Sequence, residues 1–381
     1  MKTEISSLDL HFLVRELKGL EGARVDKIYE QEEDIKDFLF IFHKTGTGKM
    51  MLRVKLPSAA YLTEYKSSFP ERPPGFCTFL RKYLGNARVK EVRQKGFERI
   101  LEIVFEVKQK DAKTGAVGSE GEMMDLTLVC ELFSKGNMIL LSPDGKIKGL
   151  LESQSWEART IRGGAKYEYP PAQTDTPDLS FDDFKKTLGN AKRDSIVKVF
   201  AMDLSLGGVY AEELCRRAGI DKNKIDLGAA DSKKAYDKLK EMIGENIEAN
   251  VFEGHVLPIK TGLALTKAYD SFNKALDDVL TDKMHSASEE REAKEKKGKE
   301  DKLSVIIRKQ EERLAALEKG VADNQRKGEL IYEHYTDVKE ALDAINADRK
   351  KMGWDELKKK YKDHKIIKDI DGKTGKVVVE L

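Results

Sequence analysis

Over roughly the first 150 residues, hydrophobic and polar residues alternate in short runs, which is the pattern of half-buried β-strands. Turn residues separate the runs, as in Ser142-Pro143-Asp144-Gly145. Helical spacing occurs behind the cap residue Ser6 and again over 76–84. This order predicts an α+β head built on an antiparallel β-sandwich with flanking helices. The runs predicted as strands are 24–29, 36–43, 50–56, 88–94, 99–108, 123–133, 138–141 and 147–151.

A segment rich in Gly, Pro and Tyr at 163–177 ends the head, and the spacing of hydrophobic residues then becomes helical. A stretch with extended character follows at 250–263, and Asp371-Gly372-Lys373 predicts a hairpin near the end of the chain. The helical stretches are 181–189, 192–200, 206–220 and 232–244.

Between these segments, a heptad pattern starts at Leu303, with hydrophobic residues spaced alternately by four and three positions. The residues between them are mostly charged, so a helix over about 288–351 has one narrow hydrophobic stripe and needs another helix to cover it. Such an arm would be about 90 Å long. The positions of the stripe are Leu303, Ile307, Gln310, Leu314, Leu317, Val321, Asn324, Gly328, Ile331, Tyr335, Val338, Leu342, Ile345 and Met352.

The charges of the chain nearly cancel. Lys and Arg number 69 and Asp and Glu 67, giving a formal net charge of +2, so any basic surface must be local. The three cysteines have no paired spacing, which predicts buried thiols in a reducing compartment, without a disulfide or a zinc site. No hydrophobic run approaches about 18 residues and the N-terminus lacks a signal core, so we expect a cytoplasmic protein without a membrane contact.

Motifs of catalysis and of cofactor or metal binding are missing from the sequence, and nothing in it argues for an enzyme. The stretch Gly46-Thr47-Gly48-Lys49 looks like half of a phosphate-binding loop. It lacks the first glycine and the following helix, so it is better explained as a hairpin turn.

Arg99 begins the predicted strand 99–108, where period-two alternation places it on the face of Leu101. A guanidinium on a hydrophobic face needs an ionic partner or a bound phosphate. Alternatively, it reaches past the edge of the sheet into solvent. Asp9 offers a similar choice, because Ser6 and Asp9 have the spacing of a capping box and a structural role is enough to explain them.

Gly207 and Gly208 form a predicted turn between two helices, where backbone N–H groups at a helix N-terminus can bind an anion. Together with Arg216, Arg217 and lysines 198, 222 and 224, this turn could hold a nucleic-acid backbone. A packed helical hairpin without a ligand is the alternative.

These stretches carry a family resemblance that runs from end to end of the chain. The sequence resembles the N-terminal part of the NFACT proteins of ribosome-associated quality control, also catalogued as fibronectin-binding protein A-like proteins. Each motif is weak alone, and their order ahead of a heptad segment is specific. The motifs are Leu8-Asp9-Leu10, Gly96-Phe97-Glu98-Arg99-Ile100, Gly136-Asn137-Met138-Ile139-Leu140-Leu141, Tyr167-Glu168-Tyr169-Pro170-Pro171, Leu206-Gly207-Gly208-Val209-Tyr210-Ala211-Glu212-Glu213 and Arg217-Ala218-Gly219-Ile220.

The resemblance implies a head over 1–174 related in fold to the formamidopyrimidine-DNA glycosylases and a helix-hairpin-helix module over 175–268. A coiled-coil arm over 269–352 and the start of a middle domain over 353–381 would follow. The family's RNA-binding domain and the returning helix of the coil are missing, which implies a fragment or an arm that pairs with a second copy as a homodimer. The glycosylases use an N-terminal proline and a zinc or equivalent finger, which this sequence lacks, so base excision is not expected.

Members of the family bind the large ribosomal subunit carrying an obstructed peptidyl-tRNA and recruit tRNA for untemplated C-terminal tailing of the nascent chain. The resemblance implies a nonenzymatic factor without a cofactor. Its partners would be that subunit, rRNA, tRNA (alanine tRNA in bacterial members) and a quality-control protein, such as a ubiquitin ligase, on the coiled coil. By position, Asp9, Glu98 and Arg99 would serve tRNA recruitment. Glu98 stands where the family usually has Asp, so the charge is kept on a longer side chain.

Two other functions stay open. One is a surface adhesin that binds fibronectin, which the older family label suggests and the missing export signal argues against. The other is a DNA-binding module without glycosylase activity, which would use the glycine turn at Gly207 and Gly208.

Overall fold

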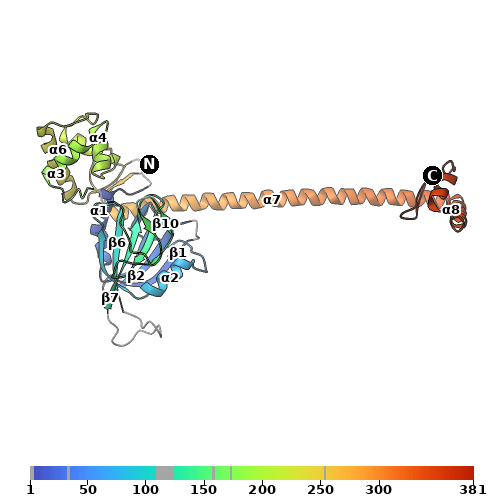
Figure 1. Ribbon diagram of the computed structural model, residues 1–381, viewed down its shortest axis with the longest axis horizontal. Coiled ribbons are helices and arrows are strands. Elements are labelled where there is room, and N and C mark those ends of the chain that lie inside the picture. Colours follow the sequence, from blue (N-terminus) through green and yellow to red (C-terminus); the bar gives the residue numbers. More distant parts are fainter. Residues whose placement is uncertain (1–3, 32–34, 109–122, 157–158, 172–173, 253–254) are drawn as a thin grey trace. The chain divides into compact units, whose positions relative to one another are not determined.

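The computed structural model describes all residues except 1–3, 32–34, 109–122, 157–158, 172–173 and 253–254, and it leaves out the side chains of 283–302. The chain forms two compact units, Met1–Ser286 and Ala287–Leu381. Helix α7 (Phe272–Glu333) begins in the first unit and ends in the second (Figure 1).

The first unit is built on one antiparallel sheet, which has nine strands within the described residues (Figure 1). Their order is β4-β3-β2-β1-β5-β6-β7-β8-β9, and β1 and β5 are paired only through Arg24 and Arg88. The sheet therefore consists of two well-paired halves with a narrow connection. The strands are β1 (Arg24–Glu30), β2 (Asp37–Lys44), β3 (Gly48–Lys55), β4 (Ala59–Leu62), β5 (Arg88–Gln94), β6 (Ile100–Lys108), β7 (Met123–Glu131), β8 (Asn137–Leu141) and β9 (Ile147–Leu150).

The two halves of the sheet share one hydrophobic core. Phe40 and Leu52 come from one half, Leu101 and Leu128 from the other, and all four are fully buried in the same cluster. The antiparallel pairing predicted from the sequence is thus confirmed. The prediction of two separate sheets is corrected, because the alternation of residues shows which face is buried but not which strands exchange hydrogen bonds.

Two helices pack against this sheet. Helix α1 (Ser7–Leu17) begins at its cap Ser6 and is followed by a 3₁₀ turn, η1 (Lys18–Leu20). Helix α2 (Gly75–Leu84) contributes Cys77, Leu80 and Leu84 to the core. Both helices were predicted, because each carries hydrophobic residues at helical spacing.

A second cluster covers the other face of the β6–β8 half, where β10 (Gln154–Ser155) and β11 (Thr160–Ile161) pair. The Tyr-Glu-Tyr motif lies here and holds buried carboxylates: the hydroxyl of Tyr167 donates to Glu131 over 2.7 Å, and that of Tyr169 donates to Glu102. Burial raises the pKa of both tyrosines, so they act as donors. This motif therefore has a structural role.

A group of helices follows in the first unit, packed around Phe184, Phe200, Leu214 and Leu239. A three-stranded sheet in the order β13-β12-β14 comes next and leads to α7. The elements are α3 (Phe181–Asn190), α4 (Ile196–Lys198), a π-helical turn η2 (Val199–Asp203), α5 (Gly208–Ala218), α6 (Ala229–Gly244), β12 (Ala249–Phe252), β13 (His255–Leu257) and β14 (Lys267–Tyr269).

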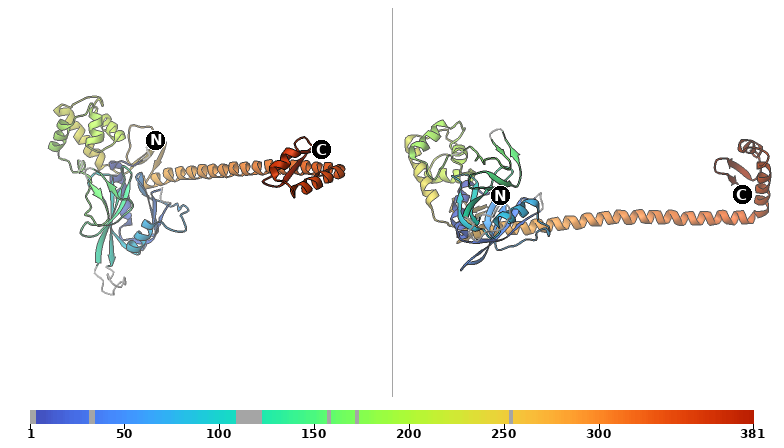
Figure 2. Two further views of the ribbon diagram at one scale, coloured as in Figure 1. Left: turned by 45° about the vertical axis from the view of Figure 1, so that its right-hand side comes forward. Right: turned by 60° about the horizontal axis from the view of Figure 1, so that its bottom comes forward.

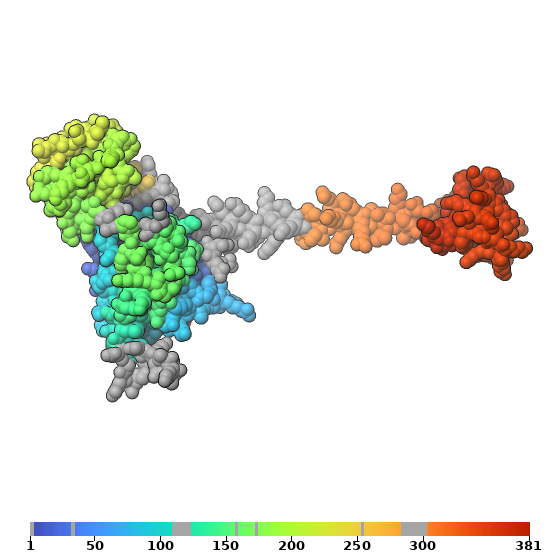
Figure 3. Space-filling model, viewed as in Figure 1, coloured from blue at the N-terminus to red at the C-terminus, as the bar shows by residue number. Residues whose placement is uncertain are grey.

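Helix α7 confirms the predicted long helix, and its first turns are packed in the core through Phe272 and Ala275. From Leu303 on, its heptad positions are exposed, as the space-filling view illustrates (Figure 3). Leu314 is 58% and Val321 66% exposed. Within α7, the stripe expected to form a coiled coil thus has no cover among the described residues.

The helix ends sooner than predicted. His334 leaves the helical conformation (φ −106°, ψ 25°), and a new helix, α8 (Tyr335–Arg349), begins after it. Heptad position Ile345 is buried against Leu357 and Ile370 in a small core of α8, α9 (Trp354–Lys360) and the hairpin of β15 (Ile367–Asp371) and β16 (Lys376–Val379) (Figure 2). The prediction of one continuous helix to 351 is therefore corrected: the helix breaks at His334, and the last part of the heptad pattern lies on a separate helix, α8.

Candidate nucleic-acid interface

The N-terminus of α1 positions Asp9. The backbone N–H and the hydroxyl of Ser6 donate to Asp9 Oδ2 over 2.6 Å and 2.8 Å, and the N–H of Asp9 donates to Ser6 Oγ over 3.2 Å. This is the capping box that the sequence predicted. Asp9 is fully buried, so its carboxylate acts through the groups it holds in place.

One of those groups comes from α5. The hydroxyl of Tyr210 donates to Asp9 Oδ1, and both side chains are buried. Burial, followed by the negative charge of Asp9, raises the pKa of Tyr210 well above its usual value, which keeps the phenol protonated. Asp9 thus joins α1 to α5 across 201 positions of sequence.

The glycine turn lies at the same joint. Gly207 has φ +77°, a conformation that favours glycine, and a Cβ atom there would lie 3.7 Å from Cβ of Ser6. Gly208 begins α5 and is exposed. The structure therefore brings the predicted site residues Asp9, Gly207 and Gly208 together at the N-termini of two helices.

Glu98 and Arg99 lie in the bend that connects β5 to β6. Gln94 holds this bend beside α1, because its amide donates to the carbonyl of Ser7 over 2.9 Å and to that of Glu98 over 2.8 Å. Glu98 is partly buried. Strand β6 begins at Ile100, one residue later than predicted, so Arg99 precedes the strand.

The ionic partner of Arg99 lies near the N-terminus of the chain. Arg99 Nη2 donates to Glu4 Oε2 over 2.7 Å and to the carbonyl of Pro57 over 3.3 Å. Its Nε is buried, without a hydrogen-bond partner in the part of the chain that the structure describes. The side chain is 25% exposed, so solvent can reach the guanidinium. The ionic partner is Glu4, while Asp9 binds Ser6 and Tyr210.

The other two predicted cations, Arg216 and Arg217, lie at the C-terminal end of α5, away from the glycine turn. Both donate to the buried carboxylate of Glu213, over 2.6–2.9 Å. Arg217 also donates to Glu245 and to the carbonyl of Lys260. An 11-residue helix separates the arginines from Gly207 by roughly 15 Å.

Glu213 is the centre of this arrangement. Burial would raise its pKa, but hydrogen bonds from Arg216 and Arg217 outweigh that effect and lower the pKa, so the carboxylate is charged. It also accepts the N–H of Gly262 over 2.9 Å. The sequence analysis did not single out Glu213, and its i,i+3 and i,i+4 spacing to the two arginines was the available signal.

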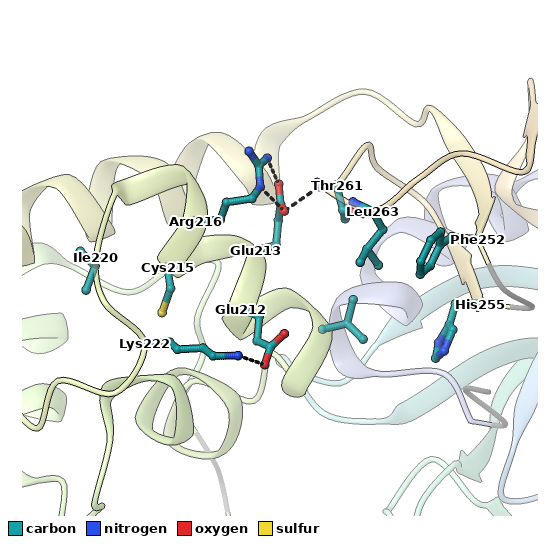
Figure 4. A pocket seen from close by; sticks show the side chains of 12 residues that line it. Glu212, Glu213, Cys215, Arg216, Ile220, Lys222, Phe252, His255, Thr261 and Leu263 are labelled. Carbon is teal, nitrogen blue, oxygen red and sulfur yellow. Dashed lines mark hydrogen bonds and ion pairs between the residues drawn. The ribbon is translucent and has the colours of Figure 1, made fainter.

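A cavity of about 500 Å³ lies beside this cluster, between α5 and the segments around β12 and β13. Figure 4 shows Phe252, His255 and Leu263 on one side and Glu212, paired with Lys222, on the other. The volume suits a small ligand or a partner's side chain. The lysines expected near the turn are paired with acidic residues: Lys198 with Asp194, Lys222 with Glu212 and Lys224 with Asp231.

The C-terminal end of α1 fixes two further helices. Arg15 donates to the carbonyls of Ile243 and Glu245 at the end of α6, over 2.7 and 2.8 Å. Glu16 accepts the N–H groups of Phe272 and Asn273 at the start of α7, over 3.1 and 2.6 Å. A carboxylate at a helix N-terminus and a cation at a C-terminus both complement the helix dipole.

The described residues also bear on metal binding, on thiol reactivity and on membrane spans. Among the described residues, no three His, Cys, Asp or Glu side chains are grouped as metal ligands. The thiols of Cys77, Cys130 and Cys215 are buried, which raises the pKa of each to about 11 or 12. Of the helices in the described part of the chain, none has the length and apolar character needed to cross a bilayer.

The architecture matches solved structures. The N-terminal part of a fibronectin/fibrinogen-binding protein from Streptococcus suis aligns with a TM-score of 0.60, at 22% identity, over 73% of this chain and 100% of that one. A fibrinogen-binding protein from Staphylococcus aureus aligns with a TM-score of 0.56, at 20% identity, over 71% and 97%. At such identities the likeness defines the class of fold.

The sequence comparisons define the family. Residues 6–377 match the family described as NFACT N-terminal and middle domains, and the chain belongs to it. The archaeal Rqc2 homolog aRqcH of Methanocaldococcus jannaschii is 30% identical over 100% of this chain and 58% of its own length. The Rqc2 homolog RqcH of Bacillus subtilis is 26% identical over 55% of this chain and 36% of its own length. The chain thus spans little more than half of the first relative.

Proposed function

We propose that this protein acts in ribosome-associated quality control. It binds the large ribosomal subunit carrying an obstructed peptidyl-tRNA and recruits tRNA for C-terminal tailing of the stalled nascent chain, without catalysing a reaction itself. The observation that carries the proposal is the match, over the full length of this chain, to a relative named as an Rqc2 homolog. The match to the Bacillus subtilis RqcH supports it.

Within the head, Arg99 is the residue proposed to contact tRNA. Its guanidinium is partly exposed, and its one ionic partner, Glu4, is itself 44% exposed. A guanidinium binds phosphate through paired N–H donors, which suits an RNA backbone. Glu98 would set the bend that carries Arg99. Asp9 would act indirectly, because its buried carboxylate fixes Ser6 and Tyr210.

The glycine turn and α7 are proposed as contacts to the ribosomal subunit and its rRNA. Gly208 is exposed at the start of α5, where backbone N–H groups favour phosphate. Arg216 is 58% exposed and can reach a phosphate, whereas Arg217 is 14% exposed and stabilises α5 through its ion pair with Glu213. The uncovered heptad stripe of α7 supports pairing with a helix of a partner protein or of a second copy.

Recovery of RNA with the intact protein tests this proposal. Protein purified from cells at low salt should bring down tRNA and the large subunit, and tRNA recovery should fall steeply as salt rises. Arg99→Ala should lower tRNA recovery about tenfold or more, because a bidentate contact to phosphate is lost, and should leave recovery of the subunit unchanged. Arg88→Ala is the control, since Arg88 is an exposed arginine of the same sheet.

Unchanged tRNA recovery with Arg99→Ala would contradict the assignment of Arg99. Absence of the large subunit from the wild-type sample would contradict the function itself. Competition with duplex DNA distinguishes this function from DNA binding. A quality-control factor should keep its bound tRNA when duplex DNA is present at the same concentration as tRNA.

A further inference from the structure

Glu4 is the ionic partner of Arg99. Its carboxylate accepts one hydrogen bond, from Nη2, while Nε of the same guanidinium has no partner among the described residues. Carboxylate and phosphate both fit the fork of an arginine, and both fit best with two parallel bonds. Glu4 therefore neutralises Arg99 through an incomplete contact.

A permanent arginine pair in the same sheet looks different. Arg53 binds Asp37 through Nε and Nη2, at 2.6–3.2 Å, and the two side chains are 1% and 5% exposed. Arg99 and Glu4 are 25% and 44% exposed and share a single bond. The fold thus builds a buried bidentate pair at Arg53 and a more exposed one-bond pair at Arg99.

The surroundings allow the carboxylate of Glu4 to leave without unfolding the site. The next residue, Ile5, is buried, and its N–H donates to the carbonyl of Ser58 over 2.9 Å. Ser6 is then held in the capping box of α1. The backbone on the C-terminal side of Glu4 is thereby fixed, while Arg99 keeps its bond to the carbonyl of Pro57.

We propose that Glu4 is an internal competitor for Arg99, which RNA phosphate displaces on binding. This inference rests on the proposed function of Arg99. The exchange replaces the one-bond contact between Nη2 and a carboxylate by a contact between the exposed part of the guanidinium and a phosphate. Glu4 thus lowers the affinity for single phosphates and leaves binding to RNAs that make several contacts.

The test measures binding of purified bulk tRNA, by fluorescence anisotropy at one fixed salt concentration. Glu4→Gln keeps the shape and removes the charge, and it should tighten binding about two- to fivefold, the range of one partly exposed ion pair. Glu91→Gln is the matched control. Glu91 is 46% exposed and pairs with Arg93 at 2.6 Å, so the change in net charge is the same. Glu91→Gln should change the affinity for tRNA less than Glu4→Gln does.

The double variant Glu4→Gln, Arg99→Ala distinguishes the possible results, because a competitor has no effect once its target is gone. Its affinity should equal that of Arg99→Ala. If Arg99→Ala weakens binding but Glu4→Gln leaves it unchanged or weakens it too, Glu4 positions Arg99 and the inference is overturned, while the proposed function stands. An equal gain from Glu91→Gln would also overturn it. If Arg99→Ala has no effect, the proposed tRNA site itself fails.

Discussion

Arg99 and Arg217 were both predicted to bind nucleic acid, and the structure gives them different surroundings. Arg217 is 14% exposed and bound to two carboxylates and a carbonyl. Arg99 is 25% exposed and bound to one half-exposed carboxylate and a carbonyl, with a buried nitrogen left over. Arg217 therefore has more internal bonds and less exposure than Arg99. Whether an arginine can bind RNA depends on the strength of its internal contacts as much as on its position in a motif.

Glu213→Ala should have the largest effect in this comparison. It leaves the largely buried Arg217 without its helical partner, so the free energy of unfolding should fall by about 3 to 5 kcal/mol. Urea denaturation measures this. Glu212→Ala is the control. Glu212 is 59% exposed and forms an ion pair with Lys222, so its replacement should lower the free energy of unfolding by less than about 1 kcal/mol. If Glu213→Ala changed the affinity for tRNA and left the free energy of unfolding unchanged, the structural role assigned to Arg217 would be contradicted.

Tyr210→Phe should have a smaller effect. It removes a donor from the buried carboxylate of Asp9 and should lower the free energy of unfolding by about 1 to 3 kcal/mol. The affinity of the folded protein for tRNA should change less than with Arg99→Ala, because Asp9 is buried. Thermal unfolding and anisotropy on the same samples decide this. A loss of tRNA binding without a loss of stability would place Asp9 in contact with RNA after all.

His11→Gln should have the smallest effect on the free energy of unfolding. It concerns a third arginine, Arg15, whose charge acts on His11. Burial, and then the charge of Arg15, lower the pKa of His11 to about 4. The unfolded chain takes up this proton near pH 6.5, so stability is complete above pH 6.5 and falls between 6.5 and 4. The loss attributable to His11 should be about 1 to 2 kcal/mol, because the ring is partly exposed.

Denaturation at pH 7 and pH 4.5 measures that loss. The decrease should be smaller in His11→Gln than in the wild type. His43→Gln, which changes an exposed histidine of β2, should leave the decrease as it is. An equal decrease in all three proteins would show that Arg15 holds α6 regardless of the charge of His11.

Much of the fold could be predicted from local patterns. Most of the strands, α1 with its capping box, α2, the glycine turn and the long helix follow from the spacing of hydrophobic residues and from cap and turn residues, which act over a few positions. The boundaries differ by one or a few residues, as at Ile100. Strand β4 was missed because Ala59-Ala60-Tyr61-Leu62 does not alternate between hydrophobic and polar residues.

The candidate site could be predicted only in part. Asp9 and Arg99 are visible in the sequence, but their partners are not: Tyr210 lies 201 positions from Asp9, and Glu4 lies 95 positions from Arg99. No local pattern encodes such pairs.

By itself, the sequence determined most of the helices and strands, and it placed the chain in its family, because hydrophobic spacing, caps and ordered motifs are properties of neighbouring residues. Only the tertiary structure decided that the strands form one sheet and that α1 joins α5, α6 and α7. It also decided that Arg217 is bound to two carboxylates and a carbonyl while Arg99 is bound to one carboxylate and a carbonyl. Those outcomes depend on burial and on hydrogen bonds between distant residues, which exist only once the chain has folded.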